Sequence, residues 1–490
     1  MSLAKRIASS ALSQVMAKFI IAALSVISVK FITQYLGVEG YGKYTVIYEM
    51  MAFSGIIADF GFFHIALREM GKDRENMPKI LGNILSMRFL LAILASVLTF
   101  SIVFFFTDYE IDTVKLGLII ALGTSTIGLM GTTITAVIQV NLKMTYAAAI
   151  QILGKITMIG YLWYAVVNDL GFLHMLYSGL IGTILVLVLT YFYTIRYSRI
   201  YFGFDWVVWR DLLRATYPMG IALILYNLTL RAPILMLDRI VKEEALTGVY
   251  GVSQRITEVL IFIPIAFMNS VLPIISKLIH DGTDEAKKHL EKIIQYSFDI
   301  LNALSLPFIA GAVILSPQII TLLSKAEFTQ GTHIFQILVS MIFFYYLSTL
   351  FGYILLAYNK QTLYMWANAW AAGVTLVAGF VITPLFREYG ALTAHILAEV
   401  VAMFVTYWYL RRFLHFKISF TNFFRMLLAS FILLGVLWSI RELLDGGSII
   451  VLILVSMIFG GGVYFGSLIL FKAIPYKEMR ELLRRGKKGD

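Results

Sequence analysis

The chain has 490 residues, of which 59% are hydrophobic and 14% are charged, and its mean hydropathy is +0.83. This composition supplies too little polar surface for a soluble globule of this length, so the chain is predicted to lie in a membrane. Cysteine is absent, which excludes disulfides, thiol nucleophiles and cysteine-based metal sites. The formal net charge is +11. Much of this excess lies in connections and in a basic tail, which indicates membrane topology and no nucleic-acid partner.

Apolar runs of about 20 residues, long enough to cross a bilayer as helices, follow one another along the chain with short connections. The runs are continuously apolar and do not alternate, which favours helices over a β-barrel. The sequence predicts an all-α polytopic membrane protein with about fourteen transmembrane helices. They span about 11–36, 43–66, 80–106, 114–141, 145–167, 171–195, 211–241, 248–275, 290–315, 330–358, 361–385, 389–411, 421–441 and 447–471.

Lysine and arginine are concentrated in the connections on one face of this arrangement. With the N-terminus inside, the inner face carries clusters such as Lys287, Lys288 and Lys292, together with the basic tail. By the positive-inside rule, both termini are predicted to be cytoplasmic. The basic cytoplasmic loops are expected to contact anionic membrane lipids. The outer connections carry only Lys43, Arg239, Lys242, Lys325, Arg387 and Arg441.

The chain also repeats itself at an offset of about 210 residues. Tyr41 and Gly42 correspond to Tyr250 and Gly251, Glu49 corresponds to Glu258, and Lys30 corresponds to Arg239. An even number of helices separates the copies, so the two halves are predicted to share one orientation and to form pseudo-symmetric lobes. The predicted divisions are a six-helix lobe at 1–200, a second at 201–415, two added helices at 416–475 and a basic cytoplasmic tail at 476–490.

Several cationic side chains lie in or beside the apolar runs, where each charge costs roughly 2.5 to 3.5 kcal/mol to insert. Such a cation is kept where it faces a wet cavity, finds a partner or reaches the interface, so the set predicts a path for an anion. The candidate substrate-binding residues are Lys18, Lys30, Arg88, Lys155, Arg231 and Arg255.

Each cation has a structural alternative. Lys18 and Arg88 are close enough to the inner face to extend to it, and Lys115, at the start of its helix, is interpreted as interfacial. Arg255 stands three residues before Glu258, so the two side chains are expected to neutralise each other on one helical face. Lys30 and Arg239 form an outer ring or anchor helix ends. Lys155 lies about ten residues from either end of its run, too deep to reach the interface easily.

Five carboxylates complete the intramembrane charges, namely Glu49, Asp59, Glu258, Asp299 and Glu399. A carboxylate at this depth pairs with a cation, stays protonated or takes up a coupling ion during transport. Ion pairing is the commonest of these roles. Coupling to H⁺ or Na⁺ is the alternative, with Asp59 and Glu258 as the first candidates. No other cofactor and no metal are expected.

The first 80 residues resemble the opening of Wzx-type polysaccharide biosynthesis flippases, within the multidrug/oligosaccharidyl-lipid/polysaccharide exporter superfamily. Three elements carry the resemblance: Lys18, the turn formed by Tyr35, Leu36, Gly37, Tyr41 and Gly42, and the A-D-x-G element of Ala58, Asp59 and Gly61 followed by Arg68. The helix count and the repeat extend the resemblance along the chain.

The resemblance implies an alternating-access flippase of the cytoplasmic membrane that moves an isoprenoid-diphosphate-linked oligosaccharide to the outer leaflet. It implies two six-helix bundles around a cavity lined by cations, which agrees with the intramembrane lysines and arginines. The partner is then a lipid-linked oligosaccharide, and the protein is expected to be a monomer. A cation-coupled multidrug antiporter of the same superfamily is the alternative, but it should have an acid-dominated cavity. A membrane glycosyltransferase is disfavoured because the outer loops are short.

Overall fold

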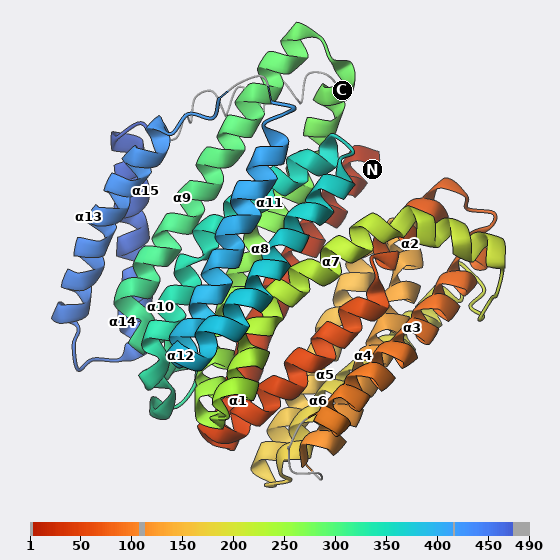
Figure 1. Ribbon diagram of the computed structural model, residues 1–490, viewed down its shortest axis with the longest axis horizontal. Coiled ribbons are helices and arrows are strands. Elements are labelled where there is room, and N and C mark those ends of the chain that lie inside the picture. The colour runs from red at the N-terminus through yellow and green to blue at the C-terminus, as the bar shows by residue number, and fades with distance from the viewer. Residues whose placement is uncertain (1–2, 107–112, 415–416, 474–490) are drawn as a thin grey trace. The chain divides into compact units, whose positions relative to one another are not determined.

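The computed structural model describes residues 3–106, 113–414 and 417–473, so the predicted tail at 476–490 lies outside the described residues. Within these ranges every regular element is a helix, coloured from red to blue along the chain in Figure 1. The elements are α1 (Leu3–Asp59), α2 (Phe62–Lys72), α3 (Met77–Phe106), α4 (Thr113–Val140), α5 (Met144–Val167), α6 (Phe172–Thr194), α7 (Trp206–Val241), α8 (Glu244–Asp281), α9 (Asp284–Leu323), the 3₁₀ helix η1 (Ala326–Gly331), α10 (Thr332–Ser340), α11 (Ile342–Ala357), α12 (Gln361–Leu410), α13 (Thr421–Leu443), α14 (Ile449–Val455), the π-helix η2 (Ser456–Gly460) and α15 (Gly461–Leu470).

Twelve helical stretches of the described chain are long and apolar enough to cross a membrane. Two of them contain a residue with non-helical backbone angles. In α1 this residue is Gly37, with φ 67° and ψ −173°, and the red ribbon of α1 reverses direction along its length in Figure 1. Gly37 has the positive φ that glycine adopts without steric cost. This one element therefore contains the predicted run 11–36 and residues 43–59 of the predicted run 43–66.

The second interrupted stretch is α12, where Arg387 has φ 52° and ψ −126°. The chain turns sharply at Arg387. This is shown by the distance between the two sides of the turn: a Cβ placed on Gly379 would lie 3.9 Å from the Cβ of Ala394. Residues on either side of Arg387 are thus side by side, as in two antiparallel helices. The predicted runs 361–385 and 389–411 are the two arms of α12.

The predicted run 43–66 is wrong at its end, because the helix stops at Asp59 and α2 begins at Phe62. Phe60 and Gly61 both have positive φ, 44° and 76°. This break is the A-D-x-G element, in which glycine fits the left-handed position at low cost. The apolar run continues through this break, so hydropathy alone does not predict it. The break holds Asp59 at the end of α1, facing the bundle of α2, α3 and α4.

The chain divides into two compact units. The first contains the described residues within 1–252, 323–328 and 364–398, and the second contains those within 253–322, 329–363 and 399–473. These units differ from the predicted divisions at 200 and 415, because the whole of α7 belongs to the first unit. The two pseudo-symmetric six-helix lobes and their bounds stay a prediction.

Helices α1 to α6 of the first unit pack through small residues. Apolar association does not drive helices together in lipid, so close backbone approach supplies much of the contact. At the crossing of α5 and α6, a Cβ on Gly182 would lie 2.7 Å from the carbonyl oxygen of Gly154. A buried cluster around Phe62, Leu81 and Ile134 joins α2, α3 and α4. Glycine at 154 and 182 thus lets α4, α5 and α6 surround a small space.

The repeated Tyr-Gly residues also lie at a close contact of the first unit. A Cβ on Gly42 of α1 would overlap the carbonyl of Glu244 in α8, and a Cβ on Gly248 would overlap the carbonyl of Val38. Gly251 packs against the side chain of Thr45 in the same way. The second arm of α1 and the start of α8 therefore meet backbone to backbone.

The linker between α6 and α7 is fastened to the start of α3. Asn83 accepts a hydrogen bond from the backbone N–H of Asp205 at 2.7 Å, and Lys79 pairs with the Asp205 carboxylate at 2.7 Å. The hydrogen bond from Lys79 lowers the pKa of the Asp205 carboxyl below its ordinary value. Asp205 also caps α7 by accepting from Val207 and Val208.

In the second unit, α13 and α15 pack on α9. Met426, Leu433, Tyr464 and Leu468 form a buried cluster with Leu306. The Tyr464 hydroxyl donates to the carbonyl of Ala303 at 3.1 Å, which satisfies its polar end inside this apolar contact. The two helices predicted as an addition are thus joined to the second unit by their buried faces.

Candidate functional site

Arg88 of α3 is a buried ion-pair residue. It is 1% exposed, pairs with Asp59 at the end of α1, and donates to the hydroxyl of Thr133 in α4 at 2.5 Å. The Asp59 side chain is 25% exposed, so the carboxylate is the wetter partner. A buried guanidinium is stable only when its charge and donors are satisfied. Arg88 therefore fixes the Asp59 break against α3 and α4.

Arg231 of α7 pairs with Glu49 of α1, and their side chains are 10% and 1% exposed. Glu49 lies in the second arm of α1, one turn beyond Thr45 and the contact with α8. The pair is almost completely desolvated, so removing either partner leaves a charge in an apolar site. This contact joins α1 to α7.

Arg255 and Glu258 form the predicted ion pair on one face of α8. The Arg255 guanidinium donates to Glu258 at 2.6 Å, and their side chains are 14% and 22% exposed. This is the i,i+3 pairing that the sequence spacing indicates. The pair lies in the second unit.

Four other cations have different surroundings. Lys18 and Lys30 of α1, like Arg239 of α7, are exposed. Lys115, predicted to be interfacial, is the third residue of α4 and is only 9% exposed. Its ammonium lies 4.6 Å from the centroid of the Phe104 ring. A cation over an aromatic face is stabilised by the ring quadrupole. Lys115 is therefore a helix-end contact.

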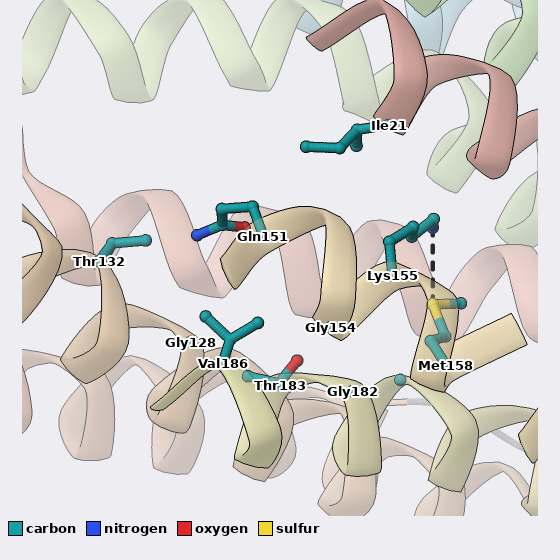
Figure 2. Close-up of a pocket in the computed structure, with 11 residues that line it drawn as sticks. Ile21, Gly128, Thr132, Gln151, Gly154, Lys155, Met158, Gly182, Thr183 and Val186 are labelled. Carbon is teal, nitrogen blue, oxygen red and sulfur yellow. Dashed lines mark hydrogen bonds between the residues drawn. The ribbon is translucent and has the colours of Figure 1, made fainter. Parts of the chain in front are cut away.

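Lys155 of α5 lines a pocket of about 200 Å³ in the first unit, shown in Figure 2. The walls come from α4, α5 and α6, and Ile21 of α1 closes one side. Lys155 is half-buried and donates to the sulfur of Met158 at 3.5 Å. An ammonium at this position can donate to an anionic oxygen in the pocket. Lys18 is three residues before Ile21, so it lies on the same helical face.

The pocket carries neutral polar groups beside its lysine. Gln151 and Lys155 are four residues apart and project from the same side of α5 in Figure 2, and the hydroxyls of Thr132 and Thr183 come from α4 and α6. The sequence did not single out these three residues, because threonine and glutamine inside apolar runs commonly bond to their own helix. The signal that finds them is their convergence in space.

The remaining carboxylates differ in their partners. Asp299 of α9 accepts from Gln295 at 3.0 Å and from Asn422 at 2.8 Å. Glu399 of α12 is 5% exposed, and in the part of the chain that the structure describes it has neither a hydrogen bond nor an ion pair. The residues of the predicted anion path thus differ in their surroundings: Arg88 and Arg231 pair with carboxylates of another helix, Arg255 pairs within α8, and Lys155 lines a polar pocket.

The described residues contain no cluster of His, Cys, Asp or Glu suited to hold a metal ion. The pocket offers one ammonium, two hydroxyls and one amide. Groups of this kind can form hydrogen bonds with the oxygen atoms of a phosphate or a sugar.

Residues 7–279 match the model of the polysaccharide biosynthesis protein family, which is more than half of the chain. The chain belongs to this family. Residues 218–381 also match the MatE family. Together with the twelve apolar spans, the matches identify a multi-pass membrane protein of the cell membrane, within the superfamily that contains both groups.

One protein with a similar sequence to this chain is the probable low-salt glycan biosynthesis flippase Agl15 of Haloferax volcanii. The two are 23% identical over 237 residues, which cover 48% of this chain and 49% of that protein. The chain thus matches about half the length of this relative.

Solved structures with the same fold include the lipid II flippase MurJ in an inward closed conformation, with TM-score 0.73, 16% identity, and coverage of 95% of this chain and 98% of that chain. A multidrug resistance MATE family transporter in an inward-facing conformation has TM-score 0.61 and 13% identity, with coverage of 82% and 98%. A MOP superfamily transporter from Pyrococcus furiosus, described by a reverse polarity of its binding pocket, has TM-score 0.60 and 13% identity, with coverage of 83% and 95%. These similarities establish the fold.

Proposed function

We propose that this chain is a flippase, a transporter and not an enzyme, that moves an isoprenoid-diphosphate-linked oligosaccharide from the inner to the outer leaflet by alternating access. Family membership and the glycan flippase relative support the substrate class. The observation that carries the proposal is Lys155, a cation inside a membrane-spanning bundle that lines a polar pocket. A diphosphate must leave water to cross the bilayer, and a positioned ammonium replaces part of its hydration.

In this proposal the intramembrane arginines and lysines have different roles. Arg88 and Arg231 pair with Asp59 and Glu49 of α1 and are assigned to holding helices in place in this conformation. Arg255 is neutralised by Glu258 within α8. Lys155 and Lys18 are assigned to the substrate diphosphate. An anion that competes for a paired arginine would weaken a helix contact, and this is how substrate binding would favour a second conformation.

For topology, we infer fourteen membrane crossings with both termini in the cytoplasm. The twelve apolar stretches become fourteen when α1 and α12 are divided at Gly37 and Arg387. An even number of crossings agrees with the positive-inside distribution of the loops. The protein is proposed to act as a monomer, with anionic lipids at its basic cytoplasmic loops.

Coupling to H⁺ or Na⁺ is proposed through Glu399 and not through the carboxylates that the sequence placed first. Asp59 and Glu258 are paired with arginines, whereas Glu399 is buried and has no partner among the described residues. An intramembrane carboxylate of this kind is a site for reversible neutralisation by a proton or a cation.

A cation-coupled multidrug antiporter is the second candidate, favoured by the match of residues 218–381 to the MatE family. The Lys155 pocket opposes it, since no carboxylate lines this pocket and the lysine would repel a cationic drug.

One experiment separates the two functions. The purified protein is reconstituted in phosphatidylcholine liposomes that contain either a fluorescent isoprenoid-diphosphate oligosaccharide or an external cationic dye. A flippase moves the lipid-linked sugar between leaflets and leaves the dye outside. Dye accumulation driven by a pH or Na⁺ gradient, without lipid transfer, would establish the antiporter instead.

A further inference from the structure

The Lys155 pocket is too small for a whole oligosaccharide. Its volume is about 200 Å³, below the roughly 300 to 1,000 Å³ of pockets that enclose drug-sized ligands. At roughly 30 Å³ for each water molecule in the liquid, this is the space of a single ring and its substituents. The pocket is therefore a subsite for one part of a larger substrate.

The charge of the pocket selects which part of the substrate enters it. Lys155 is the one Lys or Arg side chain among its lining residues. A diphosphate carries about two negative charges, and burying it completely beside one ammonium would leave charge uncompensated. The diphosphate is better placed at the wall beside Lys155, near the turn of α1 that carries Ile21 and Lys18, with a neutral group inside.

The other polar groups of the pocket suit hydroxyls. The amide of Gln151 and the hydroxyl of Thr183 each donate and accept, and neither has a hydrogen bond to another described residue. Thr132 donates to the carbonyl of Leu129 at 3.0 Å, so its oxygen remains able to accept. Sugar hydroxyls need the same mixture of donors and acceptors.

Glycines give the pocket its depth. Gly128 and Gly179 line it from α4 and α6, and a methyl group at either position would project without a clash. A Cβ on Gly128 would meet Thr183 at 3.5 Å, and a Cβ on Gly179 would meet Thr124 at 4.0 Å, both ordinary contacts. The helices would therefore tolerate alanine at both positions, and the pocket stays open only because the side chains are missing.

We infer that this pocket holds the neutral sugar ring attached directly to the diphosphate, while Lys155 contacts the phosphate at its wall. The inference rests on the proposed flippase function. It makes the first sugar a specificity determinant: Gln151, Thr132 and Thr183 bind its hydroxyls, and Gly128 and Gly179 set the largest ring that fits. The remaining sugars stay outside the pocket.

The test fills the pocket without removing a polar group. Liposomes containing the full-length protein are loaded with one of two fluorescent lipids, an isoprenoid diphosphate with a single hexose or the same isoprenoid diphosphate with no sugar. The Gly128→Ala/Gly179→Ala variant should move the hexose lipid roughly tenfold more slowly than the parent, the effect of about 1.4 kcal/mol. It should move the sugar-free lipid at the parental rate. Lys155→Ala should slow both lipids.

Gly123→Ala and Gly160→Ala are the matched controls, because a Cβ at either glycine meets no atom within 4 Å and neither residue lines the pocket. Thermal unfolding confirms that each variant is folded. Equal slowing of both lipids by the pocket-filling variant, or no slowing of either, would overturn the sugar subsite. A parent protein that moves neither lipid would instead overturn the flippase function on which the subsite rests.

Discussion

Glu49 of α1 and Arg231 of α7 form an ion pair whose side chains are 1% and 10% exposed. The pair joins two helices far apart in the sequence, and its desolvation makes each charge dependent on the other. We expect Glu49→Gln and Arg231→Gln to lower the free energy of unfolding by about 3 to 5 kcal/mol each. The double variant should lose less than the sum, because neither charge is then left alone. Unfolding in mixed detergent micelles measures this cycle, and additive losses would show that the two side chains act independently.

The contact between α1 and α8 depends on the missing side chain of Gly248. A larger residue would overlap the backbone carbonyl of Val38, and a carbonyl cannot move aside as a flexible side chain does. Gly248→Val is therefore expected to separate the two helices. Because the chain has no native cysteine, one Thr45→Cys substitution reports the change, since Thr45 is 2% exposed.

Maleimide labelling of that cysteine should be at least several-fold faster in the Gly248→Val background. Gly373→Val is the control, as a Cβ at Gly373 meets no atom within 4 Å. Equal labelling rates in all three backgrounds would show that the α1–α8 contact does not need glycine at 248.

The proposed coupling role of Glu399 predicts a change in the dependence on an ion gradient. Glu399→Gln keeps the shape of the side chain but cannot bind or release a proton near neutral pH. Lipid transfer by this variant should become insensitive to a pH or Na⁺ gradient that accelerates the parent. Asp299→Asn is the comparison, because Asp299 is held by Gln295 and Asn422, and it should keep the gradient response. If Glu399→Gln responds as the parent does, the carboxylate has no coupling role.

The Lys79–Asp205 pair predicts a pH dependence of stability. Because the hydrogen bond from Lys79 depresses the pKa of Asp205 in the folded state, the contribution of this carboxylate is present above its unfolded pKa of about 3.9. It is lost as the pH falls through the lower folded-state pKa. Asp205→Asn retains an N-cap side chain for α7. The parent should be more stable than this variant between pH 5 and 8, and the difference in melting temperature should shrink near pH 3.

A stability difference between parent and Asp205→Asn that stays constant down to pH 3 would contradict this. Asp211→Asn serves as the control, because its exposed carboxylate is 3.5 Å from Arg210 at the surface of the same helix, where a pair contributes little.

Much of the fold follows from the sequence, because apolar length determines where a helix can cross a bilayer. The reversal at Gly37 and the pairing of Arg255 with Glu258 also follow, since both depend on residues close together in the chain. The helix break at Phe60 and Gly61 could not be predicted from the apolar pattern, because the hydropathy of a residue does not depend on its backbone angles.

The candidate site was less predictable. The depth of Lys155 is visible in the sequence, but the pairing of Arg88 with Asp59 and of Arg231 with Glu49 depends on helix packing. For the same reason the sequence treats all intramembrane arginines as one set, whereas the structure separates them from Lys155. Gln151 and Thr183 acquire a role only where α5 and α6 cross at their glycines.

The role of Lys155 is measured most directly by the rate at which liposomes containing the protein transfer a fluorescent isoprenoid-diphosphate oligosaccharide between leaflets. Lys155→Ala should lower this rate roughly ten- to a hundredfold, the loss of about 1.5 to 3 kcal/mol for a hydrogen bond to a charged group. Lys155→Arg should retain part of the rate. Lys360→Ala, which removes one positive charge from the start of α12, should transfer lipid as fast as the parent. A parental rate in Lys155→Ala would contradict the assignment of the diphosphate to Lys155.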